Sequence, residues 1–417
     1  MKRTRLILVV ASMLLLCAIA VNLCGCSAKI QAKDLMAGIE PNNVSVSADF
    51  RDRGAGVTDF AVRLFQASEK EGENTLISPL SVICALAMVL NGAEGETKAQ
   101  MEATLGMSAE ELNLYIYSYM STLPEDDKKE LSIANSIWFT DDDRFEVNKD
   151  FLQVNADYYG ADIYEAPFDD SMLKDINTWV KEETDGMIPK ILDEIPDSAI
   201  MYLVNALAFD AKWETEYERN RLKDGKFTKE DGTKQNAEFM YSTEFGYFDD
   251  GNATGFIKYY KGMRYAFVAM LPNEDVSLSE YVESLDGAGL HAMLSEPQKE
   301  SVRVSMPKFE TEYDAEMSEI LSSMGMTDAF ESSEADFSGL GTSTDGNIFI
   351  EKVVHKTYIS VDENGTKAGA ATLIGMNDGA ASIEERQVYL NRPFVYMLVD
   401  CLTDTPFFIG TMTDVKN

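Results

Sequence analysis

Hydrophobic residues follow a helical spacing in some segments of the chain and run continuously in others. Apolar residues three and four positions apart predict an amphipathic helix over residues 58–67. Residues 82–90 are apolar nearly all round, which predicts a buried helix capped by Ser78 with Pro79 in its first turn. The same patterns predict further helices after a capping box of Thr97 and Gln100, and over residues 149–159, 175–181 and 317–324.

Continuous runs rich in β-branched and aromatic residues predict strands. One long run, residues 201–213, is apolar almost throughout, as expected of a strand covered on both faces, and Asn205 is its one interior amide. Pro307 interrupts the run over residues 302–309, which indicates an edge strand or a strand end. Other strands are expected over residues 131–139, 161–164, 263–271, 348–361, 395–402 and 406–410.

The first residues have the pattern of an export signal. Basic residues precede an apolar run over residues 6–21. The following Leu23-Cys24-Gly25-Cys26 resembles the lipobox of bacterial lipoproteins, which implies that Cys26 is lipidated and becomes the first residue of the mature chain. An uncleaved membrane anchor and an ordinary secretory signal are the alternatives.

The chain is expected to divide into three parts. Residues 1–25 form the lipoprotein signal peptide, and the polar residues 26–52 form a flexible tether. No linker or repeat divides residues 53–417, so we expect one large α+β domain there. The lipid on Cys26 would hold this domain at the extracellular face of the bacterial cell membrane; otherwise the protein is secreted.

A proline-free segment, residues 362–382, follows the strand that ends near residue 361. It reads DENGTKAGAATLIGMNDGAAS, with little charge and a cluster of small residues. A segment that enters an existing sheet must pair every backbone N–H and carry small inward side chains. This composition therefore predicts a latent strand, with Gly365 as its hinge.

The hinge and several separated motifs resemble the serpin family of protease inhibitors. The acidic pair Asp362-Glu363 followed by Gly365-Thr366 and an alanine-rich tract resembles the start of a serpin reactive-centre loop. Further matching segments are Asn391-Arg392-Pro393-Phe394 and residues 74–100, 325–330 and 335–339, so the resemblance runs from about residue 58 to the C-terminus.

The resemblance implies the serpin fold and mechanism. The fold has a large central, mainly antiparallel sheet, further sheets, about eight or nine helices and an exposed reactive-centre loop. The implied activity is suicide inhibition of serine endopeptidases: the protease cuts the loop, which inserts into the central sheet and traps the acyl-enzyme. A serpin that keeps the fold without the trap is the alternative.

The resemblance also assigns roles to residues of the reactive-centre loop. The implied hinge residues are Glu363, Gly365, Thr366, Ala368, Ala370 and Ala371. Alternate residues from Thr366 onward would face into the sheet, and these are small, which favours an inhibitor.

The position of the cut is less sharply defined by the loop sequence. The spacing usual in the family, counted forward from Gly365, implies a cut at Gly379-Ala380, and counted back from Asn391 it implies Ser382-Ile383, so we define a window. Its residues are Asp378, Gly379, Ala380, Ala381, Ser382 and Ile383. The small side chains favour an elastase- or subtilisin-like protease, while acidic-residue-directed serine proteases and cysteine proteases remain open.

The resemblance also assigns polar residues in apolar surroundings. Ser78, Ser81, Asn205 and His355 would form a polar cluster, the shutter, beneath the sheet. Whether they gate its opening or only satisfy one another's hydrogen bonds is left open by the sequence. Trp213 would lie in the breach, where the loop enters the sheet.

Charge and motifs exclude several other classes. With 36 basic and 71 acidic residues the formal net charge is −35, which repels nucleic acid. The chain lacks G-x-S-x-G, H-E-x-x-H and Walker A motifs, so we expect no enzyme activity, metal or cofactor. Cys84 and Cys401 are expected to be buried thiols, with a disulfide left open, and the protein is expected to be a monomer with a protease as its partner.

Overall fold

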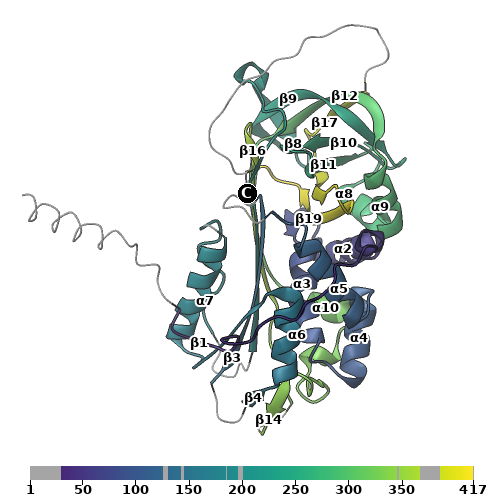
Figure 1. Ribbon diagram of the computed structural model, residues 1–417. Coiled ribbons are helices and arrows are strands. Elements are labelled where there is room, and N and C mark those ends of the chain that lie inside the picture. The colour runs from purple at the N-terminus through teal and green to yellow at the C-terminus, as the bar shows by residue number, and fades with distance from the viewer. Residues whose placement is uncertain are drawn as a thin grey trace, which may run out of the picture.

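The computed structural model describes residues 30–124, 130–141, 145–184, 186–195, 201–344, 347–366 and 386–416. In these ranges, long strands run through the middle of the molecule, with helices packed against them and a second group of strands at one end (Figure 1). This arrangement confirms the predicted α+β class.

Nine α-helices lie within the described ranges. The buried helix α3 begins as predicted: Ser78 Oγ accepts a hydrogen bond from Ser81 N at 3.3 Å, and Pro79 occupies the first turn. The helices are α2 (Gly54–Ser68), α3 (Pro79–Leu90), α4 (Gly95–Leu105), α5 (Ala109–Met120), α6 (Lys149–Tyr159), α7 (Asp170–Glu183), α8 (Leu278–Ser284), α9 (Gly287–Ser295) and α10 (Ser318–Ser323).

The predicted capping box of Thr97 and Gln100 is wrong. Helix α4 already begins at Gly95, so both residues lie inside it. Their side chains instead hold a distant segment: Thr97 Oγ1 accepts a hydrogen bond from Asp336 N at 3.0 Å, and Gln100 Oε1 accepts one from Asp328 N at 2.9 Å. Tertiary contacts have thus recruited side chains whose spacing alone resembled a cap.

The central sheet consists of two halves. One half has the order β1-β5-β3-β6 and the other β13-β15-β16-β7, and because Asp210 alone separates β6 from β7, the halves are continuous. Neighbouring strands are antiparallel except for the parallel pair β3 and β5. The strands are β1 (Lys33–Asp34), β3 (Leu131–Thr140), β5 (Asp162–Ala166), β6 (Met201–Phe209), β7 (Ala211–Lys212), β13 (Phe309–Glu316), β15 (Val354–Val361) and β16 (Gly365–Thr366).

Both faces of β6 are covered, as its apolar sequence predicts. Tyr202 and Val204 pack in a cluster with Ile176 and Trp179 of α7, while Leu203 belongs to the main core. Figure 1 shows α7 on one side of the long strands and α3, α5 and α6 on the other. The sheet is therefore a middle layer, and a new strand must enter between covered faces.

The second sheet has the order β17-β12-β9-β10-β11-β18-β19-β2, with β8 paired to β9. Strand β12 ends at Pro307, which confirms the predicted strand end. The strands of the second sheet are β2 (Thr75–Ile77), β8 (Leu222–Thr228), β9 (Lys234–Asp249), β10 (Ala253–Tyr259), β11 (Tyr265–Pro272), β12 (Gln298–Pro307), β17 (Arg386–Tyr389), β18 (Phe394–Asp400) and β19 (Thr405–Met412). A small sheet pairs β4 (Phe145–Val147) with β14 (Gly341–Ser343).

Residues 30–53 lie against the domain, although we expected a flexible tether up to residue 52. Strand β1 pairs with β5 at the edge of the central sheet. The Asp175 carboxylate of α7 accepts hydrogen bonds from Gln31 N at 2.7 Å and Ala32 N at 2.8 Å. Phe50 is buried against Tyr115. The described part of this segment is therefore docked rather than free.

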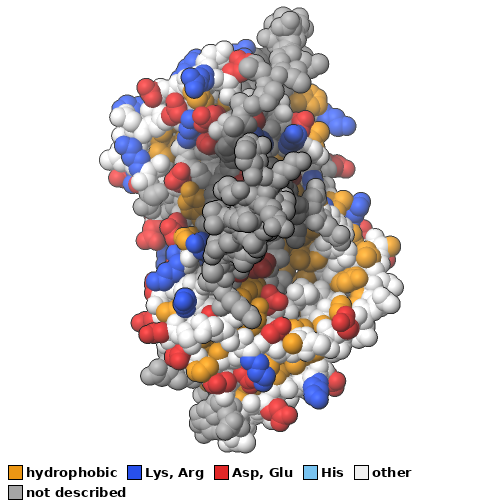
Figure 2. Space-filling model, turned by 60° about the vertical axis from the view of Figure 1, so that its left-hand side comes forward, with side chains coloured by type: hydrophobic (Ala, Val, Ile, Leu, Met, Phe, Trp, Pro, Cys, Tyr) orange, Lys and Arg blue, Asp and Glu red, His pale blue; other side chains and the backbone are white. Residues whose placement is uncertain are grey.

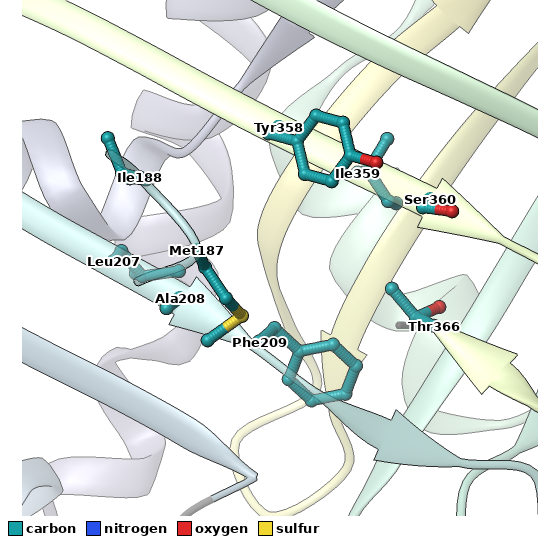
Figure 3. A pocket seen from close by; sticks show the side chains of 9 residues that line it. All are labelled: Met187, Ile188, Leu207, Ala208, Phe209, Tyr358, Ile359, Ser360 and Thr366. Atoms are coloured by element: carbon teal, nitrogen blue, oxygen red, sulfur yellow. The ribbon is translucent and has the colours of Figure 1, made fainter. Parts of the chain in front are cut away.

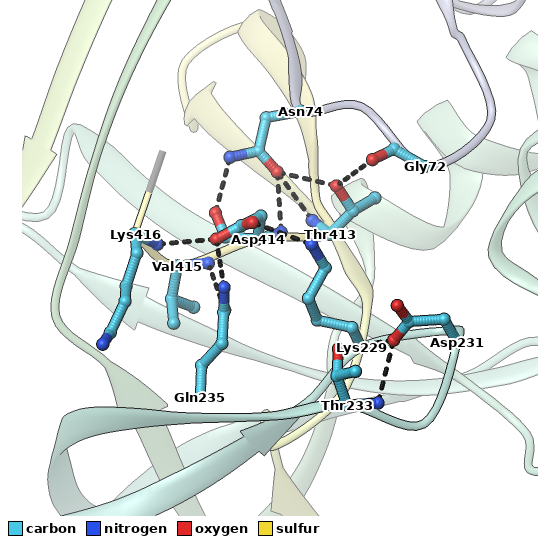
Figure 4. Close-up of polar contacts among 10 residues, drawn as sticks. All are labelled: Gly72, Asn74, Lys229, Asp231, Thr233, Gln235, Thr413, Asp414, Val415 and Lys416. Carbon is cyan, nitrogen blue, oxygen red and sulfur yellow. Dashed lines mark hydrogen bonds and ion pairs between the residues drawn. The ribbon is translucent and has the colours of Figure 1, made fainter.

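The C-terminal end is fixed by a polar network (Figure 4). Asn74 Oδ1 accepts hydrogen bonds from Thr413 N at 2.7 Å and Asp414 N at 3.0 Å, and its amide donates to Asp414 O at 2.7 Å. The Asp414 carboxylate pairs with Lys229 at 2.9 Å and accepts from Gln235 Nε2 at 2.6 Å. The network ties β19 to the start of β2 and to the β8–β9 hairpin.

Charged side chains of both signs are intermixed on the face shown in Figure 2. Both cysteines of the described ranges are free; Cys84 is buried as expected, whereas Cys401 is only partly buried. Among the helices of those ranges, none has the length and apolarity that a membrane crossing needs.

Candidate functional site

A narrow cleft separates β6 from β15 in the middle of the central sheet. At one end of the two strands, Leu203 and Val353 form a parallel bridge. At the other end, β16 pairs with both β15 and β7. Figure 3 shows the cleft between them. It is lined by Leu207, Ala208 and Phe209 of β6, Tyr358, Ile359 and Ser360 of β15, Thr366 of β16, and Met187 and Ile188.

Gly365 holds its place because the backbone of β7 approaches it closely. A β-carbon at this position would overlap the carbonyl oxygen of Ala211 and lie 2.7 Å from the α-carbon of Lys212. The φ angle of Gly365 is not in the positive range. Glycine is therefore required here for close packing rather than for a left-handed conformation, which corrects our reason for expecting it.

Thr366 is the first inward residue of the predicted latent strand, and it is already in the sheet. It pairs with Ala211 of β7 and Val361 of β15, and its side chain is 2% exposed. Its Oγ1 lies 2.5 Å from the hydroxyl of Tyr260, whose pKa is raised by burial. The structure confirms that Thr366 faces inward.

Trp213 anchors the turn that precedes β16. Its indole Nε1 donates to Asp362 O at 2.9 Å, and its backbone N–H donates to Asn364 O at 3.0 Å. The N–H of Tyr217 donates to Glu363 O at 3.0 Å, and the Trp213 ring stacks on Tyr260 with centroids 4.5 Å apart. These contacts place Trp213 beside the hinge turn, where we expected the breach.

Glu363 is held by a lysine at the end of β12. Its carboxylate lies 2.6 Å from Lys308 Nζ, which also pairs with Glu238 at 2.6 Å. Partial burial works against the charged form of Glu363 and is the largest single effect on its pKa. The hydrogen bond and the positive charge of Lys308, together with a backbone hydrogen bond, outweigh it, so the pKa of Glu363 is lowered. The hinge turn is thus fixed by an ion pair as well as by backbone bonds.

The predicted shutter residues form one connected cluster beneath the sheet. His355 Nε2 accepts a hydrogen bond from Ser78 N at 3.0 Å, and Ser81 Oγ donates to Asn205 Oδ1. Burial lowers the pKa of His355 to about 4, so the ring is neutral near pH 7 and its Nε2 is free to accept. The cluster joins α3 to β6 and β15, the strands on the two sides of the cleft.

Asn135 completes the cluster and was missed by sequence reasoning. The amide of Asn205 donates to Asn135 Oδ1, and the two residues are direct cross-strand partners in β3 and β6. Asn135 is a lone amide within the predicted strand over residues 131–139, which is the same signal that singled out Asn205.

Comparison with known proteins identifies the family. The family model described as "Serpin (serine protease inhibitor)" matches residues 55–415. The chain belongs to the serpin family. The human leukocyte elastase inhibitor is 29% identical, with 85% of this chain and 97% of that protein covered. An uncharacterized serpin-like protein of Thermococcus kodakarensis is also 29% identical, covering 87% of this chain and 85% of the relative.

Solved serpin structures agree with this fold. The thermophilic serpin tengpin in its native state is 48% identical, with a TM-score of 0.88 over 92% of this chain and all of that one. Tengpin in its latent state gives a lower TM-score of 0.79 at 47% identity. The described part of this serpin is therefore more similar to the native than to the latent arrangement.

Several predicted site residues lie outside the described residues. They are Ala368, Ala370 and Ala371 of the hinge, Asp378, Gly379, Ala380, Ala381, Ser382 and Ile383 of the cleavage window, and Cys26. The structure brings together the rest of the predicted site: hinge, breach and shutter surround one cleft.

Proposed function

We propose that this serpin is a suicide inhibitor of serine endopeptidases. One observation carries the proposal: Gly365 and Thr366 already form a strand between β15 and β7, and the cleft between β6 and β15 continues directly beyond Thr366. A loop cut beyond residue 366 would extend β16 along this cleft. The first residues of the extended strand, Gly365 and Thr366, are thus paired with their neighbours before the loop is cut.

The free energy of insertion is large enough for a trap. Lengthening β16 by some fifteen residues adds about a dozen backbone hydrogen bonds at about 1 kcal/mol net each, so roughly 10 kcal/mol is released. This matches the stability of an ordinary domain, so an attached protease would be distorted before its ester to the loop is hydrolysed. The uncut form would then persist through a kinetic barrier.

The proposed target is an elastase- or subtilisin-like serine protease. The window over residues 378–383 is rich in small side chains, which suit a shallow primary pocket. The relative named leukocyte elastase inhibitor supports this class of target. Cysteine proteases are the second class to be tested.

The decisive experiment mixes the purified domain, residues 30–417, with pancreatic elastase or subtilisin. An inhibitor gives an adduct that survives SDS, with a mass equal to the protease plus the cleaved serpin. A serpin without the trap is cut and gives no adduct with either protease or with papain, and that result would contradict the proposal.

We also propose that the chain is a bacterial lipoprotein anchored through Cys26, with its domain outside the cell. The Leu23-Cys24-Gly25-Cys26 sequence after an apolar run supports this. Expression of the full chain in a bacterium with labelled palmitate should label the protein, and Cys26→Ser should abolish the label. Cys24→Ser is the matched control that should keep it.

A further inference from the structure

A lysine is buried beneath the hinge. Lys258 of β10 is 2% exposed, although a buried ammonium group loses much of its hydration free energy. Its Nζ lies 2.8 Å from Glu244 Oε1 of β9 and donates a hydrogen bond to Thr215 O at 3.2 Å. Glu244 Oε1 also accepts from Ser242 Oγ at 2.5 Å. The ammonium group is therefore paired with a carboxylate and hydrogen-bonded to a backbone carbonyl.

The same ammonium lies between two aromatic rings. Lys258 Nζ is 4.4 Å from the ring centroid of Tyr217 and 5.3 Å from that of Trp213. A cation at these distances is attracted to both rings, more strongly when it is shielded from water. Together with the bond to Thr215 O, these contacts fix the bend over residues 213–217 at three points.

This bend is the element that receives the hinge turn. Backbone N–H groups of Trp213 and Tyr217 and the indole of Trp213 donate to the carbonyls of residues 362–364. Contacts thus run without a gap from Glu244 through Lys258 and the bend to the turn, and from the turn to Thr366 in the sheet.

We propose that Lys258 is a positioning residue for loop insertion, with Glu244 as its counter-ion. By fixing the bend, it keeps the hinge turn and β16 in the register from which insertion starts. This inference rests on the proposed function, because the register matters only if the cut loop inserts.

The proposal predicts an effect on the outcome of the protease reaction. After the cut, insertion competes with hydrolysis of the acyl-enzyme, and slower insertion releases more cleaved serpin without an adduct. A released bend would let the hinge turn leave the sheet, so that insertion must first re-form this register. If the ion pair only stabilised the fold, its removal would raise hydrogen exchange over the whole domain and not in the hinge alone.

The test uses three variants of the domain over residues 30–417. Lys258→Met with Glu244→Gln removes both charges, so that no buried charge is left unpaired. Lys258→Arg keeps a cation at the site. Lys261→Met removes an exposed lysine three residues along the chain and is the matched control.

Two readouts are needed: hydrogen exchange of the amides over residues 362–366, and moles of serpin consumed per mole of elastase inhibited. In the double variant, exchange of the hinge amides should rise on the order of tenfold, as for loss of one charged hydrogen bond, with amides of β18 unchanged. The number of serpins consumed should rise severalfold. Lys258→Arg should stay closer to the wild type, and Lys261→Met should match it.

Unchanged hinge exchange in the double variant would overturn the proposal, and so would a uniform rise over the hinge and β18. The wild-type adduct is measured first and reports on the proposed function alone. If the wild type forms no adduct, that function fails, and the inference about insertion fails with it, whereas an adduct with unchanged hinge exchange overturns only the role of Lys258.

Discussion

At the scale of single residues, Thr366 lies at the point in the sheet from which insertion of the cut loop is proposed to start. It is buried and lies in hydrogen-bonding contact with Tyr260, so a small polar residue fills the available space. Each inserted residue of the same parity must enter this layer between the sheet and the elements behind it. A long charged side chain would be buried there without a partner.

We therefore expect Thr366→Arg to abolish the SDS-stable adduct while the loop is still cleaved. The arginine would hold β16 out of the sheet, so hydrolysis of the acyl-enzyme would win. Adduct and cleaved serpin are quantified on the same gel, with Thr366→Ser as the control that keeps the adduct. An undiminished adduct in Thr366→Arg would refute the insertion argument.

His355 predicts a pH dependence of stability. Burial lowers its pKa to about 4, against about 6.5 in an unfolded chain, so the unfolded state binds the proton first as the pH falls. The contribution of the neutral His355 ring to the free energy of unfolding is fully present above about pH 6.5 and is lost progressively toward pH 4. It amounts to about 3 kcal/mol over that window.

Melting temperatures at one fixed heating rate, from pH 7 to pH 4.5, check this sign. The wild type should lose more stability than His355→Gln, whose amide can still accept from Ser78 N but binds no proton. His291→Gln removes the other histidine and should follow the wild type. Parallel curves for His355→Gln and the wild type would contradict this role for His355.

At the scale of elements, local pattern was sufficient where a helix or strand depends on its own residues. The buried helix α3 with its Ser78 cap, and α6 over residues 149–159, follow from spacing and capping alone. Some residues that act through distant partners were not identified from the sequence. The place of Asn135 in the shutter cluster follows only once the register of β3 and β6 is known. The hydrogen bond that Thr97 accepts from Asp336 N likewise follows only from the three-dimensional arrangement.

The segment over residues 186–195 lies against the cleft and is fastened by Asn177 of α7. Asn177 Oδ1 accepts from Ile191 N at 2.8 Å and Leu192 N at 3.1 Å, and its amide donates to Leu192 O at 2.9 Å. Asn177→Ala would leave these backbone groups without their partner. We therefore expect the free energy of unfolding to fall by at least about 2 kcal/mol.

Thermal melting and hydrogen exchange over residues 186–195 measure this effect. Asn220→Ala is the control, because Asn220 is exposed and its side chain donates a hydrogen bond to the carboxylate of Glu218 on the surface. Equal exchange of residues 186–195 in the two variants would show that Asn177 does not fasten the segment.

At the scale of the whole molecule, the sequence indicated the domain and its central sheet, but not how the N-terminal segment joins them. Residues 30–53 are polar and irregular, which is typical of a tether. In the structure they extend the sheet through β1 and bond to the Asp175 carboxylate, a partner more than a hundred residues away in the sequence. Local composition carries no information on such a contact.

On the proposed function, the intact serpin is metastable and the cut loop completes its central sheet. The most direct test compares the melting temperature of the intact domain with that of the same domain cut within residues 378–383. Insertion worth roughly 10 kcal/mol should raise the melting temperature by at least about 10 °C, and cleaved Thr366→Arg should show a much smaller rise. A cleaved wild-type domain that melts no higher than the intact one would contradict the account.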